Sequence, residues 1–199
     1  MKIVEVQTLA IPEVKVITVE KFRDARGYFL EHYRESDAAA AAPFLAGQRF
    51  VQGNGSFSRA GTVRGMHFQW SPPVGKLVRT VVGHMIDLVL DVRAESPTFG
   101  HIIAFEMPSR EATAELIWIP PGLAHGNTFL ADTYIEYLCT GEYNAAGEGA
   151  VSPLADDIDW SLCDERLRRL VRSVLDDAPV MSPRDREAPG VGAWSRELR

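Results

Sequence analysis

The chain has 199 residues, of which 46% are hydrophobic and 24% charged, and its formal net charge is −6. This composition is ordinary for a soluble globular protein and argues against a disordered chain or a membrane protein. The acidic net charge argues against a duplex nucleic acid as partner, because such proteins present a basic face. The length predicts a single domain over residues 1–199.

Short segments with period-two or continuous apolar patterns, separated by glycine, proline and polar turns, predict many strands. We expect them at residues 2–8, 14–20, 49–52, 63–69, 77–82, 86–92, 100–106, 115–119, 127–130 and 134–139. So many short strands at close spacing predict an all-β sandwich, jelly roll or barrel.

Two segments are predicted to be helical. Residues 36–47 open with good N-cap residues and are rich in alanine. Residues 161–177 start with Ser161 and Asp164 in capping-box spacing, so we expect a helix on the outside of the barrel. Its apolar residues fall on one helical stripe: Leu167, Leu170, Val171 and Val174. The tail after residue 186 is predicted to be loosely held.

Neither the N-terminus nor the cysteines indicate export. The first ten residues lack the basic region and continuous apolar run of a secretory signal. Cys139 and Cys163 have neither metal-ligand spacing nor a disulfide pattern, and we expect Cys139 to be buried in a strand. Apolar runs such as 86–92 are of strand length and contain aspartates, so none spans a bilayer. These features predict a cytoplasmic protein that does not bind membranes.

The stretch VRGMHFQ, residues 63–69, places a histidine inside a predicted strand. Side chains alternate along a strand, so His67 should share a face with Gly65 and Gln69, and Arg64 should lie on the other face. A glycine within a strand can also mark a bulge that re-aims Arg64 or His67. His67 is then either a satisfied core residue or part of a site.

Nucleophilic catalysis and metal binding are two kinds of chemistry that could use this histidine. No serine or cysteine lies in a nucleophile elbow or beside an obvious base. Small β-barrels often bind a metal through two histidines one residue apart plus a glutamate, but here the second position is Gln69. The sequence therefore predicts no metal, although a metal-dependent barrel stays an alternative.

The motifs DARGYFLE, VQGNGSFS, GTVRGMHFQ, GKLVR, SPTFG, IPPGLAHG, YLCTGEY and MSPRD occur in this order between about residues 21 and 188. Their succession resembles the dTDP-4-dehydrorhamnose 3,5-epimerase family of sugar-nucleotide epimerases. The resemblance implies a cupin-like jelly roll with a few peripheral helices, acting without a cofactor as a homodimer. It also implies a thymidine diphosphate 4-keto-6-deoxy sugar as substrate.

The resemblance implies four catalytic residues. His67 matches the base that removes a proton from the carbon beside the keto group, at a pKa naturally near working pH. Asp185 matches the partner that orients the imidazole. Removing this proton leaves an enolate, and Lys76 matches the residue that stabilises the negative charge on the enolate oxygen. Tyr137 matches the acid that returns a proton from the far face of the sugar ring.

Other residues match the family's substrate contacts. Tyr143 resembles the residue that stacks on the pyrimidine. The remaining matches to diphosphate, sugar and thymidine contacts are Arg26, Glu31, Gln52, Asn54, Arg64, His125, Glu148 and Arg184. In this family Arg26 and Glu31 reach the site of the partner subunit, so dimerisation would be functional.

The chain also departs from the family pattern. Asn127 stands where the family usually has phenylalanine, Ser152 precedes Pro153 where aspartate is usual, and the predicted helix 161–177 looks like an insertion. These differences concern the fit of the substrate. The enzyme could invert carbon 3, carbon 5 or both, and the substrate could instead be a cytidine or guanosine diphosphate sugar. A barrel that binds a sugar nucleotide without catalysis is a further alternative.

Overall fold

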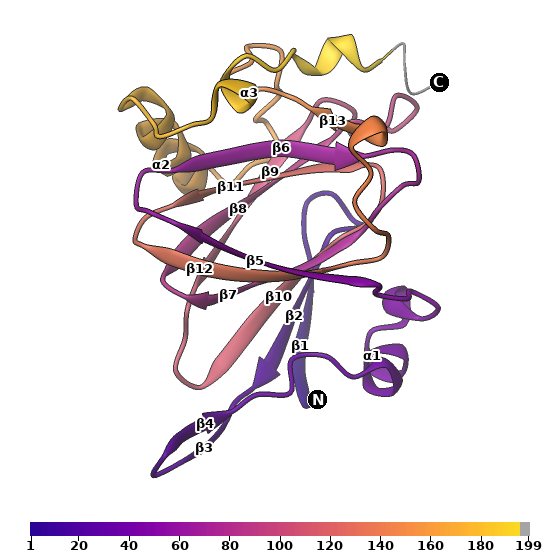
Figure 1. Ribbon diagram of the computed structural model, residues 1–199, viewed down its shortest axis with the longest axis vertical. Coiled ribbons are helices and arrows are strands. Elements are labelled where there is room, and N and C mark those ends of the chain that lie inside the picture. Colours follow the sequence, from indigo (N-terminus) through magenta and orange to yellow (C-terminus); the bar gives the residue numbers. More distant parts are fainter. Residues whose placement is uncertain (196–199) are drawn as a thin grey trace.

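The structure is a computed structural model that describes residues 1–195, and its strands form two facing antiparallel sheets (Figure 1). In order across the larger sheet lie β1 (Ile3–Thr8), β2 (Lys15–Glu20), β10 (Thr113–Ile119), β7 (Lys76–Val82), β12 (Thr133–Cys139) and β5 (Gln52–Ser58). The smaller sheet contains β13 (Glu148–Ala150), β6 (Val63–Gln69), β11 (Leu123–Phe129), β8 (His84–Asp91) and β9 (Ile102–Pro108). This arrangement confirms the predicted all-β jelly roll with peripheral helices.

Three apolar clusters hold the layers together. Val78, Val89 and Ile135 belong to the cluster between the two sheets. The outer face of the larger sheet is covered by α1 (Glu35–Ala41) and the short helix η1 (Pro43–Leu45). The outer face of the smaller sheet is covered by α2 (Glu165–Asp176) and the C-terminal segment. Burying both faces of each sheet provides the hydrophobic stabilisation of the fold.

All ten predicted strands overlap an observed strand. The range 49–52 does so only at Gln52, because β5 begins there and continues through a polar, glycine-containing stretch that carries little strand signal. Three short strands were not predicted: β13 and the pair β3 (Phe22–Asp24) and β4 (Gly27–Phe29), which form a hairpin that projects from the molecule (Figure 1). Cys139 is buried in β12, as predicted.

The predicted helices are shorter than expected. The helix 36–47 is wrong as one element, because Pro43 cannot continue the hydrogen bonds of α1 and starts η1 instead. The helix α2 begins after Asp164, whose side chain accepts a hydrogen bond from the backbone N–H of Leu167 at 3.0 Å. The capping box from Ser161 is therefore wrong, and Asp164 is the N-cap.

The segment after residue 186 packs against the smaller sheet up to Trp194. Val191 is buried, and the Trp194 indole N–H donates to the carbonyl of Ala150 at 3.0 Å. The Trp194 ring meets Phe68 edge to face at 5.0 Å between centroids. The expectation of a loosely held tail does not apply to these residues, because Val191 and Trp194 bury apolar surface. Residues 196–199 lie outside the described part of the chain.

A β-bulge in β6 changes which side chains face inward. His67 pairs with His125 of β11, and Arg64 pairs with Asn127, so two residues of β6 face Gly126 alone. Gly65 has φ +100°, and a Cβ there would lie 2.5 Å from the Gly126 Cα. Only glycine fits this conformation and this close approach. Regular alternation, which places Arg64 and His67 on opposite faces, is thus wrong here, and the alternative of a glycine-marked bulge that re-aims one of these side chains is confirmed.

We expect Asp164→Ala to lower the free energy of unfolding by about 1 kcal/mol, because the first turn of α2 loses its side-chain acceptor. Ser161→Ala is the control, since Ser161 is exposed and lies before the helix. It should change stability by less than about 0.5 kcal/mol. Urea unfolding of both variants measures the difference, and equal effects would contradict Asp164 as the cap.

Candidate active site

Two adjoining cavities lie between the sheets and share His67, Lys76 and Tyr137. The smaller, about 160 Å³, extends toward Arg64, His125, Asn127 and Asp185. The larger, about 360 Å³, extends toward Gln52, Asn54, Tyr143 and Glu148. The predicted site residues of β5, β6, β7, β11 and β12 therefore converge on one elongated space.

His67 and Asp185 form a hydrogen-bonded pair at one wall. The distance from His67 Nε2 to Asp185 Oδ1 is 2.7 Å, and Asp185 is only 4% exposed. Asp185 lies in α3 (Pro183–Arg186), where its N–H donates to the N-cap Ser182 hydroxyl. Because an ionised carboxylate can only accept, Nε2 carries the ring proton and Nδ1 keeps a free lone pair.

Burial lowers the pKa of His67, and the neighbouring Asp185 carboxylate partly offsets this by raising it. Before reaction the unprotonated imidazole is thus favoured. Once the imidazole has taken up a proton, its positive charge is stabilised by the Asp185 carboxylate in contact with it. A group with these properties suits general-base chemistry.

Lys76 brings a cation to the centre of the site. Its ammonium donates to the His67 carbonyl at 3.3 Å, which places it beside the base. Burial lowers the pKa of Lys76, while Cys139, Glu148 and Asp87 each raise it. An ammonium in such a dry setting can stabilise a developing oxyanion strongly.

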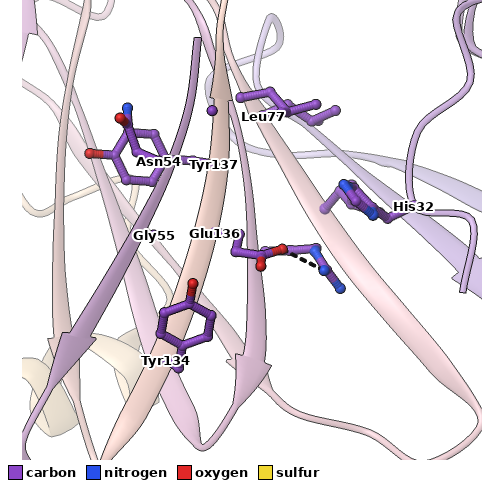
Figure 2. Close-up of a pocket in the computed structure, with 11 residues that line it drawn as sticks. His32, Asn54, Gly55, Leu77, Tyr134, Glu136 and Tyr137 are labelled. Carbon is purple, nitrogen blue, oxygen red and sulfur yellow. Dashed lines mark hydrogen bonds and ion pairs between the residues drawn. The ribbon is translucent and has the colours of Figure 1, made fainter.

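Tyr137 comes from the larger sheet, whereas His67 comes from the smaller one. Figure 2 shows Tyr137 and Asn54 on the opposite side of their strands from Glu136 and His32. Burial raises the pKa of Tyr137, so its hydroxyl remains a neutral donor. An imidazole and a phenol hydroxyl therefore line the cavity from opposite sheets.

The hollow drawn in Figure 2 is a further cavity, which Asn54 and Tyr137 also border. It encloses about 300 Å³ on the outer face of the larger sheet, and Leu77 and His32 line it. The guanidinium of Arg79 is bonded to Glu136 there at 2.5 Å. The Tyr134 ring lies over Gly55, and a Cβ on Gly55 would lie only 2.3 Å from the Tyr134 hydroxyl. Of its lining residues, only Asn54 and Tyr137 were predicted as site residues.

The larger cavity is bordered by the residues predicted to bind a nucleotide. Tyr143 is 59% exposed, and its hydroxyl donates to Glu148 at 3.0 Å. Arg184 also contacts Glu148. The Gln52 carbonyl accepts the Tyr143 N–H at 2.9 Å, and its amide donates to Asn54 at 3.1 Å. An exposed, tethered aromatic ring of this kind offers a stacking surface.

Gln69 has a positioning function that the sequence did not suggest. Its amide donates to the carbonyls of Pro72 and Glu142, each at 3.1 Å, and its carbonyl accepts from the N–H of Asn144 at 2.8 Å. These bonds hold the segment that carries Tyr143 against the end of β6.

His125 and Asp87 form a second pair at the floor of the smaller cavity. His125 Nε2 lies 2.8 Å from Asp87 Oδ2, and Asp87 is fully buried. His125 was predicted as a substrate contact, but Asp87 was not predicted as part of the site. The available signal was an aspartate within an otherwise apolar strand, since such a charge is buried only when it is paired.

Two predicted site residues lie elsewhere in this chain. The Arg26 side chain is 90% exposed in the β3–β4 hairpin and pairs with Asp24. Glu31 is bonded to the N-terminal ammonium of Met1 and to Arg34. Among residues 1–195, neither Arg26 nor Glu31 lines the two cavities around His67.

Residues 1–195 contain no group of three or more histidine, cysteine, aspartate or glutamate side chains that could hold a metal ion. In the same part of the chain, no helix has the length and apolar character needed to cross a membrane.

Comparisons with known proteins agree with this geometry. The sequence model of dTDP-4-dehydrorhamnose 3,5-epimerase matches residues 8–192. The enzyme of that name from Sinorhizobium fredii is 46% identical over 142 residues, covering 70% of each chain. The one from Pseudomonas aeruginosa is 36% identical over 185 residues, covering 90% of this chain and 91% of its own.

Solved structures show the same fold. A dTDP-6-deoxy-D-glucose-3,5-epimerase from Legionella pneumophila, in complex with dTDP-4-keto-L-rhamnose, superposes with a TM-score of 0.82 at 30% identity and covers 98% of this chain and 96% of its own. A 3'-monoepimerase from Streptomyces bikiniensis, in complex with dTDP-quinovose, gives 0.73 at 28% identity, with 100% and 91% covered. The chain belongs to the dTDP-4-dehydrorhamnose 3,5-epimerase family and is an epimerase of deoxysugar biosynthesis.

Proposed function

We propose that this chain inverts carbon 3, carbon 5 or both of a thymidine diphosphate 4-keto-6-deoxyhexose by removing and returning a proton, without a metal or cofactor. The observation that carries the proposal is the bonded pair His67–Asp185 on one sheet side, with Tyr137 on the other sheet and Lys76 beside them. The catalytic roles below are part of the same proposal.

The keto group at carbon 4 acidifies the protons on carbons 3 and 5. His67 Nδ1 takes one of these protons, and the electron pair moves onto the keto oxygen as an enolate. The Lys76 ammonium stabilises that charge, which develops only as the reaction proceeds. Tyr137 then gives its hydroxyl proton to the same carbon from the opposite face, which inverts the centre. Exchange with solvent restores the starting protonation of both residues.

The nucleotide part is assigned to the larger cavity. Tyr143 stacks on the base, while Gln52, Asn54 and Glu148 contact the nucleotide. Arg184 and Arg64 bind the diphosphate and sugar, because a guanidinium donates two parallel hydrogen bonds to phosphate oxygens. His125 contacts the sugar at the other end. Thymidine is the proposed base because ligands of the structural relatives contain dTDP.

Inversion at a single carbon is the second candidate. One structural relative is named a 3'-monoepimerase, so this fold carries that specificity as well. A cytidine or guanosine diphosphate sugar is the corresponding alternative for the nucleotide. A barrel that only binds the sugar nucleotide would leave the His67–Asp185 pair without a use.

We also propose that the enzyme is a homodimer in which the β3–β4 hairpin completes the partner's site. The hairpin exposes Phe22, Tyr28 and Phe29, and Tyr134 is exposed on the outer face of the larger sheet. Clustered exposed aromatic residues are typical of protein interfaces. Contact with another copy would bring Arg26 and Glu31 to a substrate. A cytoplasmic location stays a prediction.

Proton NMR of the thymidine diphosphate 4-keto-6-deoxyglucose in heavy water tests the reaction. We expect deuterium at carbon 3, carbon 5 or both, at an undiminished rate in the presence of a chelator. The position that exchanges decides between one-carbon and two-carbon inversion. Absence of exchange with thymidine, cytidine and guanosine diphosphate 4-ketosugars would rule out the proposed function.

Substitutions at His67 and Tyr137 should separate abstraction from inversion. His67→Asn should reduce both exchange and epimerisation by ~10²–10⁴-fold, the usual cost of losing a general base. Tyr137→Phe should retain exchange but lose inversion, because only the donor is removed. Asp185→Asn should leave thymidine diphosphate binding nearly unchanged while turnover falls. Near-native exchange in His67→Asn would place the base elsewhere.

Mixing two inactive variants tests the dimer. His67→Asn and Arg26→Ala are each expected to be inactive, but a mixed dimer contains one site with an intact His67 and an intact partner Arg26. Random reassortment of equal amounts should therefore restore about a quarter of the native sites, by the symmetry of a two-fold dimer. Mixtures of His67→Asn with Lys76→Ala, two residues of one cavity, are the control and should stay inactive. No recovery with Arg26→Ala would mean that Arg26 does not act across subunits.

A further inference from the structure

Asn127 is a buried amide in the smaller cavity that lacks a hydrogen-bond partner on one atom. It lies on β11, is 4% exposed and lines the cavity together with His67 and Tyr137. Within the described part of the chain, its side-chain oxygen Oδ1 accepts no hydrogen bond. Such a group loses its bonds to water on folding without replacement, which costs free energy.

The surroundings of Asn127 do not supply the missing donor. Its cross-strand neighbour on β8 is Asp87, whose Oδ1 is also buried without a partner among residues 1–195. The other Asp87 oxygen is bonded to His125 at 2.8 Å. A half-turn of the Asn127 amide, which exchanges its oxygen and nitrogen, lets Nδ2 donate to the Asp87 carboxylate and turns Oδ1 toward the cavity, where a bound ligand has to supply its donor.

The position of Asn127 in the site indicates which part of a substrate it meets. The residues assigned to the nucleotide border the larger cavity, and Asn127 lines only the smaller one. His67, Lys76 and Tyr137 lie between, so the sugar ring occupies the smaller cavity. Of the groups on a 4-keto-6-deoxy ring, the keto oxygen and the methyl group donate no hydrogen bond. The ring hydroxyls on carbons 2 and 3 do.

We propose that Asn127 accepts a hydrogen bond from a ring hydroxyl of the sugar, on carbon 2 or carbon 3, and thereby makes the enzyme select substrates that keep this hydroxyl. The proposal rests on the proposed function above and names a specificity determinant within its site. A site built to pair with a hydroxyl rejects the analogue that lacks it, because the protein group then stays buried and unpaired. Asn127 acts in sugar recognition and takes no proton.

A cycle that combines enzyme variants with substrate analogues tests this. The substrates are the thymidine diphosphate 4-keto-6-deoxyglucose and its 2-deoxy and 3-deoxy forms, and the variant is Asn127→Leu, which removes the acceptor at similar volume. We expect the native enzyme to disfavour one deoxy analogue by ~10²-fold or more in kcat/KM. Asn127→Leu should lower kcat/KM for the parent sugar by about the same factor and leave that analogue nearly unchanged. The analogue that couples to Asn127 identifies the hydroxyl.

Ile135→Val is the matched control, because Ile135 lines the same cavity without a polar atom in its side chain. It should change all three substrates by the same factor. Thymidine diphosphate should bind Asn127→Leu as it binds the native enzyme, which shows that the variant is folded. Equal effects of Asn127→Leu on all three substrates, or none, would overturn the inference. If the native enzyme exchanges no deuterium into the parent sugar, the proposed function itself has failed.

Discussion

The close approach of β6 and β11 at Gly65 and Gly126 is the constraint on which the site depends. A side chain at either glycine would collide with the opposite strand, so both positions must be glycine. The approach lets β6 take one extra residue, which turns Arg64 and His67 toward the cavity and leaves Met66 and Phe68 in the outer apolar cluster. A regular strand would place only one of the two polar side chains inside.

In the jelly roll, the polar side chains around the cavities come from two different sheets. The proposed base, His67, comes from the smaller sheet, while the proposed acid, Tyr137, and the proposed cation, Lys76, come from the larger sheet. Beside the apolar cluster between the two sheets, these groups border cavities of about 160 and 360 Å³, which the proposed substrate would occupy. Burial lowers the pKa of His67, which favours an unprotonated imidazole, and raises the pKa of Tyr137, which keeps its hydroxyl protonated. Burial also lowers the pKa of Lys76 and so opposes its ammonium form, but Cys139, Glu148 and Asp87 act in the other direction.

The sequence predicted the strands with apolar alternation well, and β6 was predicted to the residue, because burial on one or two faces leaves a direct pattern. It placed only the first residue of β5, because Gly53 and Asn54 leave no apolar pattern. Its glycines suggested a bulge in β6 but not which side chain the bulge turns inward, because that depends on the partner strand. The resemblance supplied His67 and Asp185 together. No local signal links residues 118 positions apart. Asp87 and Gln69 needed the structure, because their roles follow from hydrogen bonds across strands and loops.

Asp185 lies late in the chain, in the same stretch that covers the smaller sheet. All strands of both sheets are complete by Ala150, whereas Asp185 follows on α3, after α2 in the chain. Until this stretch is synthesised, the outer apolar face of β6 has no cover and His67 has no carboxylate partner. One C-terminal stretch therefore both completes the hydrophobic core of the smaller sheet and forms the His67–Asp185 pair, so a truncation within it removes stability and the pair together.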